Sequence, residues 1–140
     1  MREVCLTIIG FIGSALSYFL GGVDTMFIIM CVFLAVDYIS GVIVAMVFKN
    51  STKTENGKVN STVSFKGLLK KFYMVCLVGV AHLLDIALGV NFIRAGVITA
   101  FVANETISII ENAGLMGIPI PKVLQNALEV LNEREDNINE

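Results

Sequence analysis

Long uncharged runs alternate with short polar breaks along this chain. The first run, 4–23, has twenty consecutive positions without a charge, and the second, 25–48, is interrupted by Asp37 alone. An α-helix rises about 1.5 Å per residue, so either run can cross the roughly 30 Å hydrocarbon core of a bilayer. The apolar region of a cleaved signal peptide has only about 7 to 15 residues, and we therefore expect the first run to be a retained helix. The glycine-rich break between the runs predicts a tight reversal.

Two further apolar runs follow a polar segment. We predict a third helix at 72–93 and a fourth at 95–113, although the ionisable side chains of the fourth make its insertion costly. The alternative is three spans, with the fourth segment interfacial or partly inserted. Apolar residues recur at helical spacing after two prolines, which predicts an amphipathic helix and then an acidic tail within 122–140. The predicted fold class is all-α, with a membrane domain at 1–121.

The composition favours an integral membrane protein. Hydrophobic residues make up 56% of the chain and charged residues 16%, and the mean hydropathy is +0.80. A soluble domain carries roughly 25% charged residues. The three cysteines lie singly in apolar runs, without the spacing of a disulfide framework or a metal site. We therefore expect no cofactor, no metal and no nucleic-acid partner.

Basic residues are concentrated in the polar segment 49–71. This segment holds six of the ten basic residues against a single acid, Glu55: Lys49, Lys53, Lys58, Lys66, Lys70 and Lys71. The positive-inside rule places this loop in the cytoplasm, together with the N-terminus two spans before it. The same lysines suit anionic lipid headgroups. The C-terminus is cytoplasmic with four spans and external with three.

Small residues share one face of the first predicted helix. At 100° per residue, five of them fall within about 100° of one another: Gly10, Gly13, Ser14, Ser17 and Gly21. Such a stripe lets helix backbones approach closely in lipid, and it predicts helix packing within or between subunits. Gly41, one turn from Asp37 on the second helix, is a further packing candidate.

Polar side chains inside the predicted spans are the candidate functional residues. Asp37 lies in the second helix, and His82 and Asp85 are near enough on the third to hydrogen-bond. Five more cover an arc of about 120° on the fourth: Asn104, Glu105, Ser108, Glu111 and Asn112. Ionisable groups at bilayer depth usually face a partner, a cavity or a pore. This face lines an aqueous lesion built by several subunits, or it is buried in one subunit against Asp85, His82 or Arg94.

Five motifs carry a resemblance to a known family. They are LGGVDTM at 20–26, VDYISGV at 36–42, FKGLLKKF at 65–72, LLDIALG at 83–89 and NETISIIENAGLMGIPIPKVL at 104–124. The last is the most specific, because it combines two acids, two asparagines, a glycine and two prolines in a fixed order. The chain resembles the bacteriophage holins, in the group that includes the holin-like protein of clostridial toxin loci.

The resemblance implies a multi-pass protein of the bacterial cytoplasmic membrane that oligomerises into lesions, depolarises the cell and releases an endolysin. The implied partners are further copies of the chain, membrane lipid, an antiholin, and the endolysin as cargo released without specific binding. Three alternatives are a holin-like exporter of toxins or other proteins without wholesale lysis, a small ion or proton transporter, and a membrane-embedded enzyme. A transporter would use Asp37, His82, Asp85 and Glu105. An enzyme needs a nucleophile and a base within reach, which one histidine and scattered carboxylates do not indicate.

Overall fold

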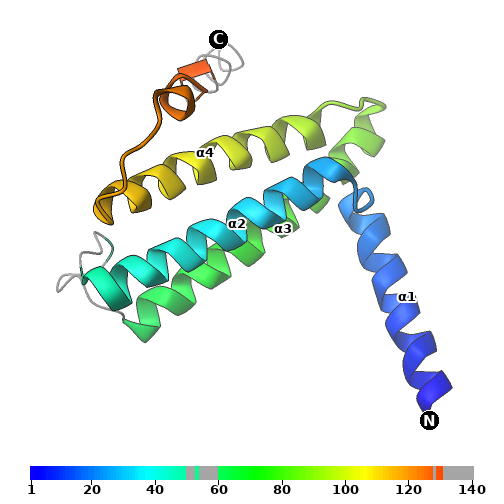
Figure 1. The fold of residues 1–140 in the computed structure, drawn as a ribbon. Helices are drawn as coiled ribbons and strands as arrows, with labels where there is room; N and C mark the ends of the chain where they lie inside the picture. Colours follow the sequence, from blue (N-terminus) through cyan, green and yellow to red (C-terminus); the bar gives the residue numbers. More distant parts are fainter. Residues whose placement is uncertain (50–52, 54–59, 128, 131–140) are drawn as a thin grey trace.

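A computed structural model describes residues 1–49, 53, 60–127 and 129–130, and these form an all-helical fold (Figure 1). Within this part, four helices are long and apolar enough to cross a membrane. They are α1 (Arg2–Leu20), α2 (Thr25–Ile43), α3 (Ser61–Leu88) and α4 (Ile93–Leu115), and α2 continues into a π-helical turn, η1 (Val44–Phe48). A short helical segment follows at 122–127. The predicted all-α class with four candidate spans is confirmed.

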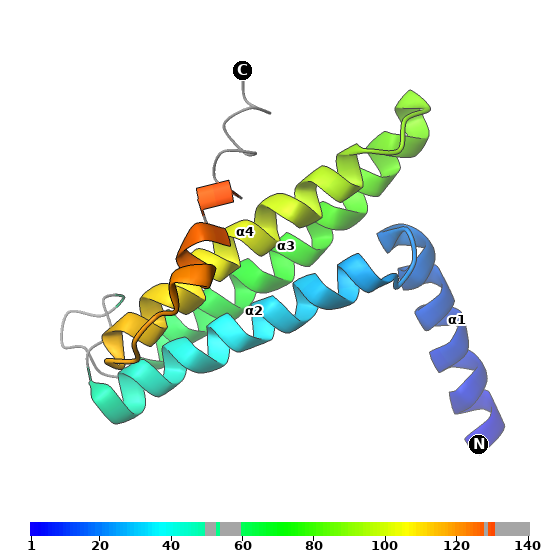
Figure 2. The same ribbon diagram turned by 45° about the horizontal axis from the view of Figure 1, so that its top comes forward.

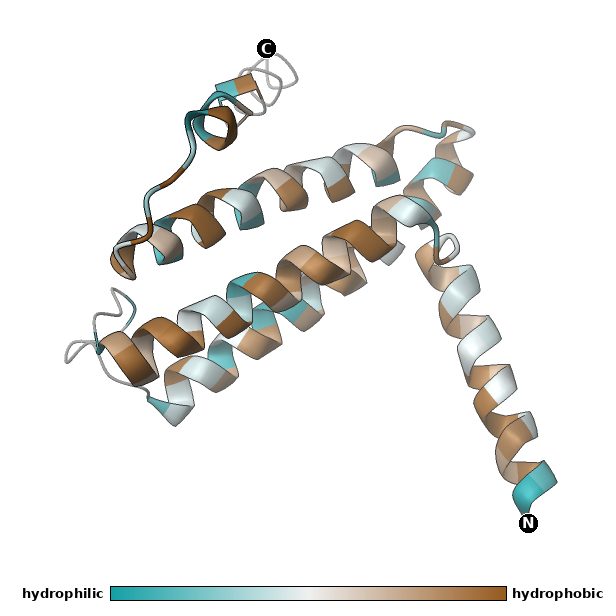
Figure 3. Cartoon of the chain, viewed as in Figure 1, coloured by the Kyte–Doolittle hydropathy of each residue, from teal (hydrophilic) through white to brown (hydrophobic). Residues whose placement is uncertain are grey.

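Helices α2, α3 and α4 lie side by side as a bundle, whereas α1 meets this bundle only near its own C-terminal end (Figures 1 and 2). The buried core is formed by Phe27, Met30 and Leu34 of α2, Val78 of α3 and Ile98 of α4. Many large hydrophobic side chains of α1 and α2 are exposed, and much of both helices has the colour of hydrophobic residues in Figure 3. Such outward-facing apolar surface is what a helix needs where lipid, and not water, surrounds it.

The joint between α1 and α3 depends on a glycine. A Cβ atom added at Gly79 would overlap the ring of Phe19, so the absence of a side chain lets this ring lie directly on the backbone of α3. Helix α1 then ends at Gly21, whose φ of 76° is the left-handed cap that glycine adopts without strain. Towards the N-terminus, Gly10 and Gly13 have open space around them. The small-residue stripe of α1 is therefore open at Gly10 and Gly13, whereas its last member, Gly21, lies against His82 and Arg94.

The third helix begins earlier than the sequence pattern predicts. We expected a loop up to residue 71, but α3 starts at Ser61, where the Asn60 side chain caps it by accepting hydrogen bonds from the amides of Thr62 and Val63 at 2.9 and 3.4 Å. Asparagine is among the strongest N-cap residues. The physical reason for the error is that charged residues end a hydrophobic run without ending a helix, which continues beyond the hydrocarbon core.

Because α3 starts at Ser61, three of the six lysines assigned to the basic loop lie on a helix. Lys66, Lys70 and Lys71 lie on α3, Lys49 directly follows η1, and Lys53 lies in a turn. Lys58 is outside the described residues. Helix α3 also ends at Leu88, five residues before the predicted end at 93, because Gly89 caps it in the left-handed conformation. The other three predicted spans agree with the structure to within three residues at either end. In the C-terminal region, residue 128 and residues 131–140 are likewise outside the described part.

Candidate functional site

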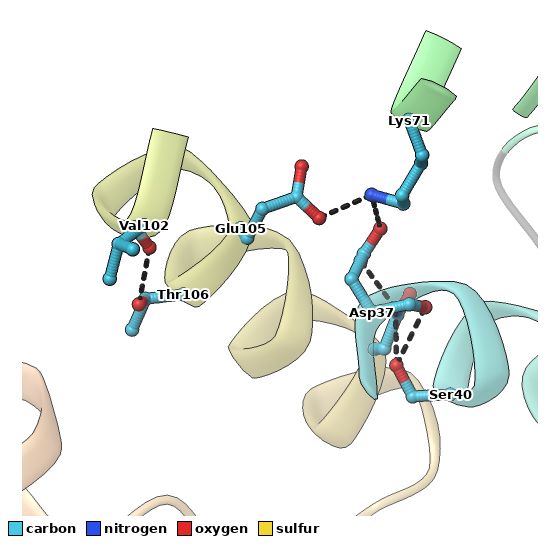
Figure 4. A network of polar contacts seen from close by, with 7 residues as sticks. Asp37, Ser40, Lys71, Val102, Glu105 and Thr106 are labelled. Atoms are coloured by element: carbon cyan, nitrogen blue, oxygen red, sulfur yellow. Dashed lines mark hydrogen bonds and ion pairs between the residues drawn. The ribbon is translucent and has the colours of Figure 1, made fainter. Parts of the chain in front are cut away.

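An ionic triad of Asp37, Lys71 and Glu105 joins the three helices of the bundle (Figure 4). The Lys71 ammonium lies 2.7 Å from Asp37 Oδ2 on α2 and also donates a hydrogen bond to Glu105 Oε2 on α4. Asp37 and Glu105 are each only 3% exposed. One ammonium thus bridges two buried carboxylates, and each helix supplies one member.

Asn112 extends the triad along the interface between α2 and α4. Its amide nitrogen donates to Asp37 Oδ1 at 3.2 Å and to the Ser40 hydroxyl at 2.8 Å. The Ser40 hydroxyl donates in turn to the Asp37 carbonyl oxygen at 3.0 Å. A Cβ at Gly41 would lie 3.7 Å from the same amide nitrogen, so the predicted packing position faces this network. No buried polar side-chain atom lacks a partner in the described part of the chain.

The triad lies deep in the bundle. Asp37 follows the first residue of α2 by twelve positions, and Glu105 follows the first residue of α4 by twelve. Both carboxylates are thus about 18 Å from the same end of the bundle, close to the middle of a hydrocarbon core of about 30 Å. Lys71 starts further from that end, seventeen positions before Leu88, and its long side chain reaches inward. Ionic groups at this depth are costly unless they are paired, as they are here.

A second polar cluster, which we call the Arg94 clamp, lies at the end of the bundle where α1 stops. The Arg94 guanidinium donates to the Leu20 carbonyl oxygen at 2.7 Å, to the Gly22 carbonyl oxygen at 2.9 Å and to Asp24 Oδ2 at 2.7 Å. Asp24 also caps α2 by accepting from the Phe27 amide at 2.9 Å. The guanidinium and this amide hold the pKa of Asp24 below its ordinary value. The clamp therefore connects α4 to the turn between α1 and α2.

Asp85 belongs to this end of the bundle and not to the triad. Its two carboxylate oxygens accept hydrogen bonds from the amides of Ile93 and Arg94 at 2.9 and 3.0 Å, so it caps the first turn of α4. The neighbouring His82 lies against the turn after α1, because a Cβ at Gly21 would be 2.6 Å from His82 Nδ1. The Asp85 carboxylate is thus engaged by backbone amides, where the sequence suggested a hydrogen bond with His82.

A cavity of about 460 Å³ opens beside the triad between α2, α3 and α4. Its buried part includes Asp37 and Glu105, and its exposed part includes Lys66 and Lys70 of α3. This cavity lies towards the end of the bundle that the positive-inside rule predicts to be cytoplasmic. Across the described residues, no group of His, Cys, Asp and Glu side chains is arranged to hold a metal ion.

The predicted polar face of α4 is divided in the structure. Glu105 and Asn112 are buried, Ser108 is half-buried and lines the cavity, and Asn104 and Glu111 are exposed. Glu105 contacts α3 and Asn112 contacts α2. The partners that the sequence suggested for this face, Asp85, His82 and Arg94, lie at the other end of the bundle.

The residue that sequence reasoning missed is Lys71, which was assigned to a loop. The signal that could have identified it is the N-cap asparagine followed by a helical run through FKGLLKKF.

These features define a small membrane protein of four candidate spans whose ionisable groups are paired inside a helical bundle. Residues 14–133 match the model of the bacteriophage holin family, and the chain belongs to that family.

Similar proteins come from several bacteria. An uncharacterised protein of Listeria innocua is 36% identical over 128 residues, which cover 91% of this chain and 85% of the relative. One from Halalkalibacterium halodurans is 31% identical over 130 residues, covering 89% and 90%. An uncharacterised 14.9 kDa protein in the nagH 3′ region of Clostridium perfringens is 31% identical over 126 residues, covering 89% of each chain. No solved structure matches the chain.

Proposed function

We propose that this protein is a phage holin that accumulates in the cytoplasmic membrane and then oligomerises into lesions through which an endolysin reaches the cell wall. The observation that carries the proposal is the ionic triad at mid-bundle depth, in a chain of the holin family. In the closed subunit the two buried carboxylates are paired with Lys71, and large hydrophobic side chains are exposed along the candidate spans. The protein can therefore accumulate without breaching the membrane.

The same triad supplies polar surface for a lesion. When neighbouring subunits rearrange, water can replace Lys71 as the partner of the two carboxylates. The exchange removes the ion pairs and restores hydration, so the two arrangements differ by much less than the gross energy of either set of contacts. A two-state change of this kind requires a small free-energy gap that subunit contacts can overcome. Asp37 and Glu105 are the groups that we assign to this exchange.

Helix α1 offers a surface for contact between copies. Its small-residue face has open space at Gly10 and Gly13 within the chain. Because lipid supplies no hydrophobic drive for helix association, close backbone approach across such a face is a source of packing energy. We assign this face to packing between subunits, with the N-terminus and the basic segment on the cytoplasmic side.

The proposal is tested by inducing the protein in a bacterium that also makes a cytoplasmic endolysin. Membrane potential and culture turbidity are followed together. A holin gives abrupt depolarisation followed by lysis, with lysis only when both proteins are present. Endolysin outside intact, polarised cells would identify a holin-like exporter instead. Steady growth with undiminished potential at high membrane accumulation would contradict both.

A matched pair of variants tests the triad itself. Glu105→Gln leaves one carboxylate for one ammonium in the buried cluster, which favours the closed subunit and should delay lysis. Glu111→Gln removes the same charge from an exposed position two turns along the same helix, and it should lyse with wild-type timing. Membrane levels are matched by immunoblotting. Equal timing for both variants would show that the triad has no part in triggering.

A further inference from the structure

The cavity beside the triad has a shallow apolar groove next to it on the outside of α3. The groove is lined by Leu69, Lys70, Phe72, Tyr73 and Met74, and it shares Lys70 and Met74 with the cavity. Phe72 and Tyr73 are exposed. A basic hollow therefore adjoins a shallow apolar channel along the same helix.

The exposed part of the cavity carries positive charge that no acidic side chain pairs with among the described residues. Lys66 and Lys70 are one helical turn apart on α3, and neither forms an ion pair with any described residue. The acids deeper in the cavity are already bridged by Lys71. Asn60 and Ser64 also line the cavity and add an amide and a hydroxyl as uncharged donors. This set of donors suits a phosphodiester oxygen.

The depth of these lysines matches that of lipid headgroups. Helix α3 has 28 residues and is about 42 Å long, which exceeds the hydrocarbon core of about 30 Å. Measured from Leu88, Lys70 lies about 27 Å along the helix and Lys66 about 33 Å. With Leu88 at one boundary of the hydrocarbon core, the two ammonium groups are at the opposite boundary, where phosphates lie.

We propose that this cavity and groove form a binding site for one anionic phospholipid. The phosphodiester binds Lys66 and Lys70, and an acyl chain follows the groove past Phe72 and Tyr73. The groove is the reason for assigning a lipid and not free phosphate, because a soluble anion would make no use of an apolar channel beside its site. Basic pockets between membrane helices are suited to anionic headgroups on general electrostatic grounds.

The test compares two double variants that lose the same charge. Lys66→Gln/Lys70→Gln removes the site, and Lys49→Gln/Lys122→Gln removes two lysines that do not line the cavity. Each protein is reconstituted in phosphatidylcholine bilayers containing phosphatidylglycerol, and retained lipid is identified by native mass spectrometry after extraction. We expect the wild type and the control to retain one phosphatidylglycerol, and the site variant to bind it about 30-fold more weakly, as two lysine–headgroup contacts require. Equal loss in both variants would overturn the proposal, because it would show attraction by net charge alone.

Two further arms distinguish the source of the phosphate and control for folding. Inorganic phosphate at millimolar concentration should not displace the lipid. Displacement would mean that the site binds a free anion, and it would contradict the assignment of a lipid. Phe72→Ser shortens the apolar groove while leaving both lysines in place, and it should weaken retention of phosphatidylglycerol. Unchanged retention would refute the groove assignment. Circular dichroism confirms helicity, and all these readouts are independent of lysis.

Discussion

Lys71→Met is the sharpest perturbation of the closed subunit. The substitution keeps the length and helix propensity of the side chain but removes the ammonium that bridges Asp37 and Glu105. Both carboxylates are 3% exposed, so little of either is in contact with water while the bundle stays closed. The variant leaves two buried acids facing one another without the ammonium that bridges them.

The loss of stability expected for Lys71→Met follows from the burial of the two carboxylates. Removing one partner of a buried ion pair costs about 3–5 kcal/mol, because the remaining charge stays buried and uncompensated. At about 1.4 kcal/mol per factor of ten, the closed arrangement becomes less favoured by between about one hundred and a few thousand. Lys71→Met should therefore unfold at lower denaturant in mixed micelles and, where it accumulates, trigger lysis early. This direction is opposite to that expected for Glu105→Gln.

The assay measures helicity and intersubunit crosslinking during titration with sodium dodecyl sulfate in detergent micelles. Lys49→Met is the matched control, since it removes the same charge from an exposed position that lies outside both the triad and the cavity. The triple variant Asp37→Asn/Lys71→Met/Glu105→Gln is a rescue, because exchange of a complete buried ionic set for neutral groups is often close to neutral. The reasoning is refuted if Lys71→Met unfolds within about 0.5 kcal/mol of Lys49→Met, the range of an ordinary surface substitution.

Two further predictions concern the α1 end of the bundle. Gly79→Ala should destabilise the joint with Phe19 by about 1–3 kcal/mol, since the added methyl group overlaps the ring. Gly96→Ala should not destabilise the protein, because there is open space around this glycine. Thermal unfolding in detergent compares the two variants. The Arg94 clamp lowers the pKa of Asp24, so its contribution to stability is complete above the ordinary value of 3.8 and is lost as pH falls through the lower folded-state pKa. Asp24→Asn should flatten this acid dependence, and an unaltered acid profile would disprove the link.

The four helices were predictable because each contains an apolar run of membrane-spanning length. The predicted fourth helix, 95–113, is shorter than α4 by only two residues at either end, even though it contains Glu105 and Glu111. Hydrophobic length governs this outcome because a span must satisfy its own backbone in lipid. The start of α3 was not predictable in the same way, because Lys66 and Lys70 end the apolar run while the helix continues at headgroup depth.

Helical angles predicted which residues of α4 share a face, but they could not predict which neighbours that face would meet. An arc of about 120° is wider than the line along which α4 contacts its neighbours. Glu105 and Asn112 therefore became buried, while Asn104 and Glu111 at the edges of the arc remained exposed. The partner on α3 required long-range information, since Lys71 and Glu105 are 34 positions apart.

The two polar clusters contribute differently because they differ in access to water. The side chain of Asp24 in the Arg94 clamp is 50% exposed, and exposed ion pairs contribute about 0–1 kcal/mol because water competes for both partners. The ion pair with Asp24 can thus break and re-form at little cost, whereas the Arg94 side chain is 12% exposed and its bonds to the Leu20 and Gly22 carbonyl oxygens fix where α4 meets the turn after α1. The carboxylates of the triad are far less accessible in the closed subunit, since Asp37 and Glu105 are each 3% exposed. Exposing Asp37 and Glu105 is consequently the larger electrostatic step between a closed subunit and a wetted lesion, and substitutions there, more than at Asp24, should move the time of lysis.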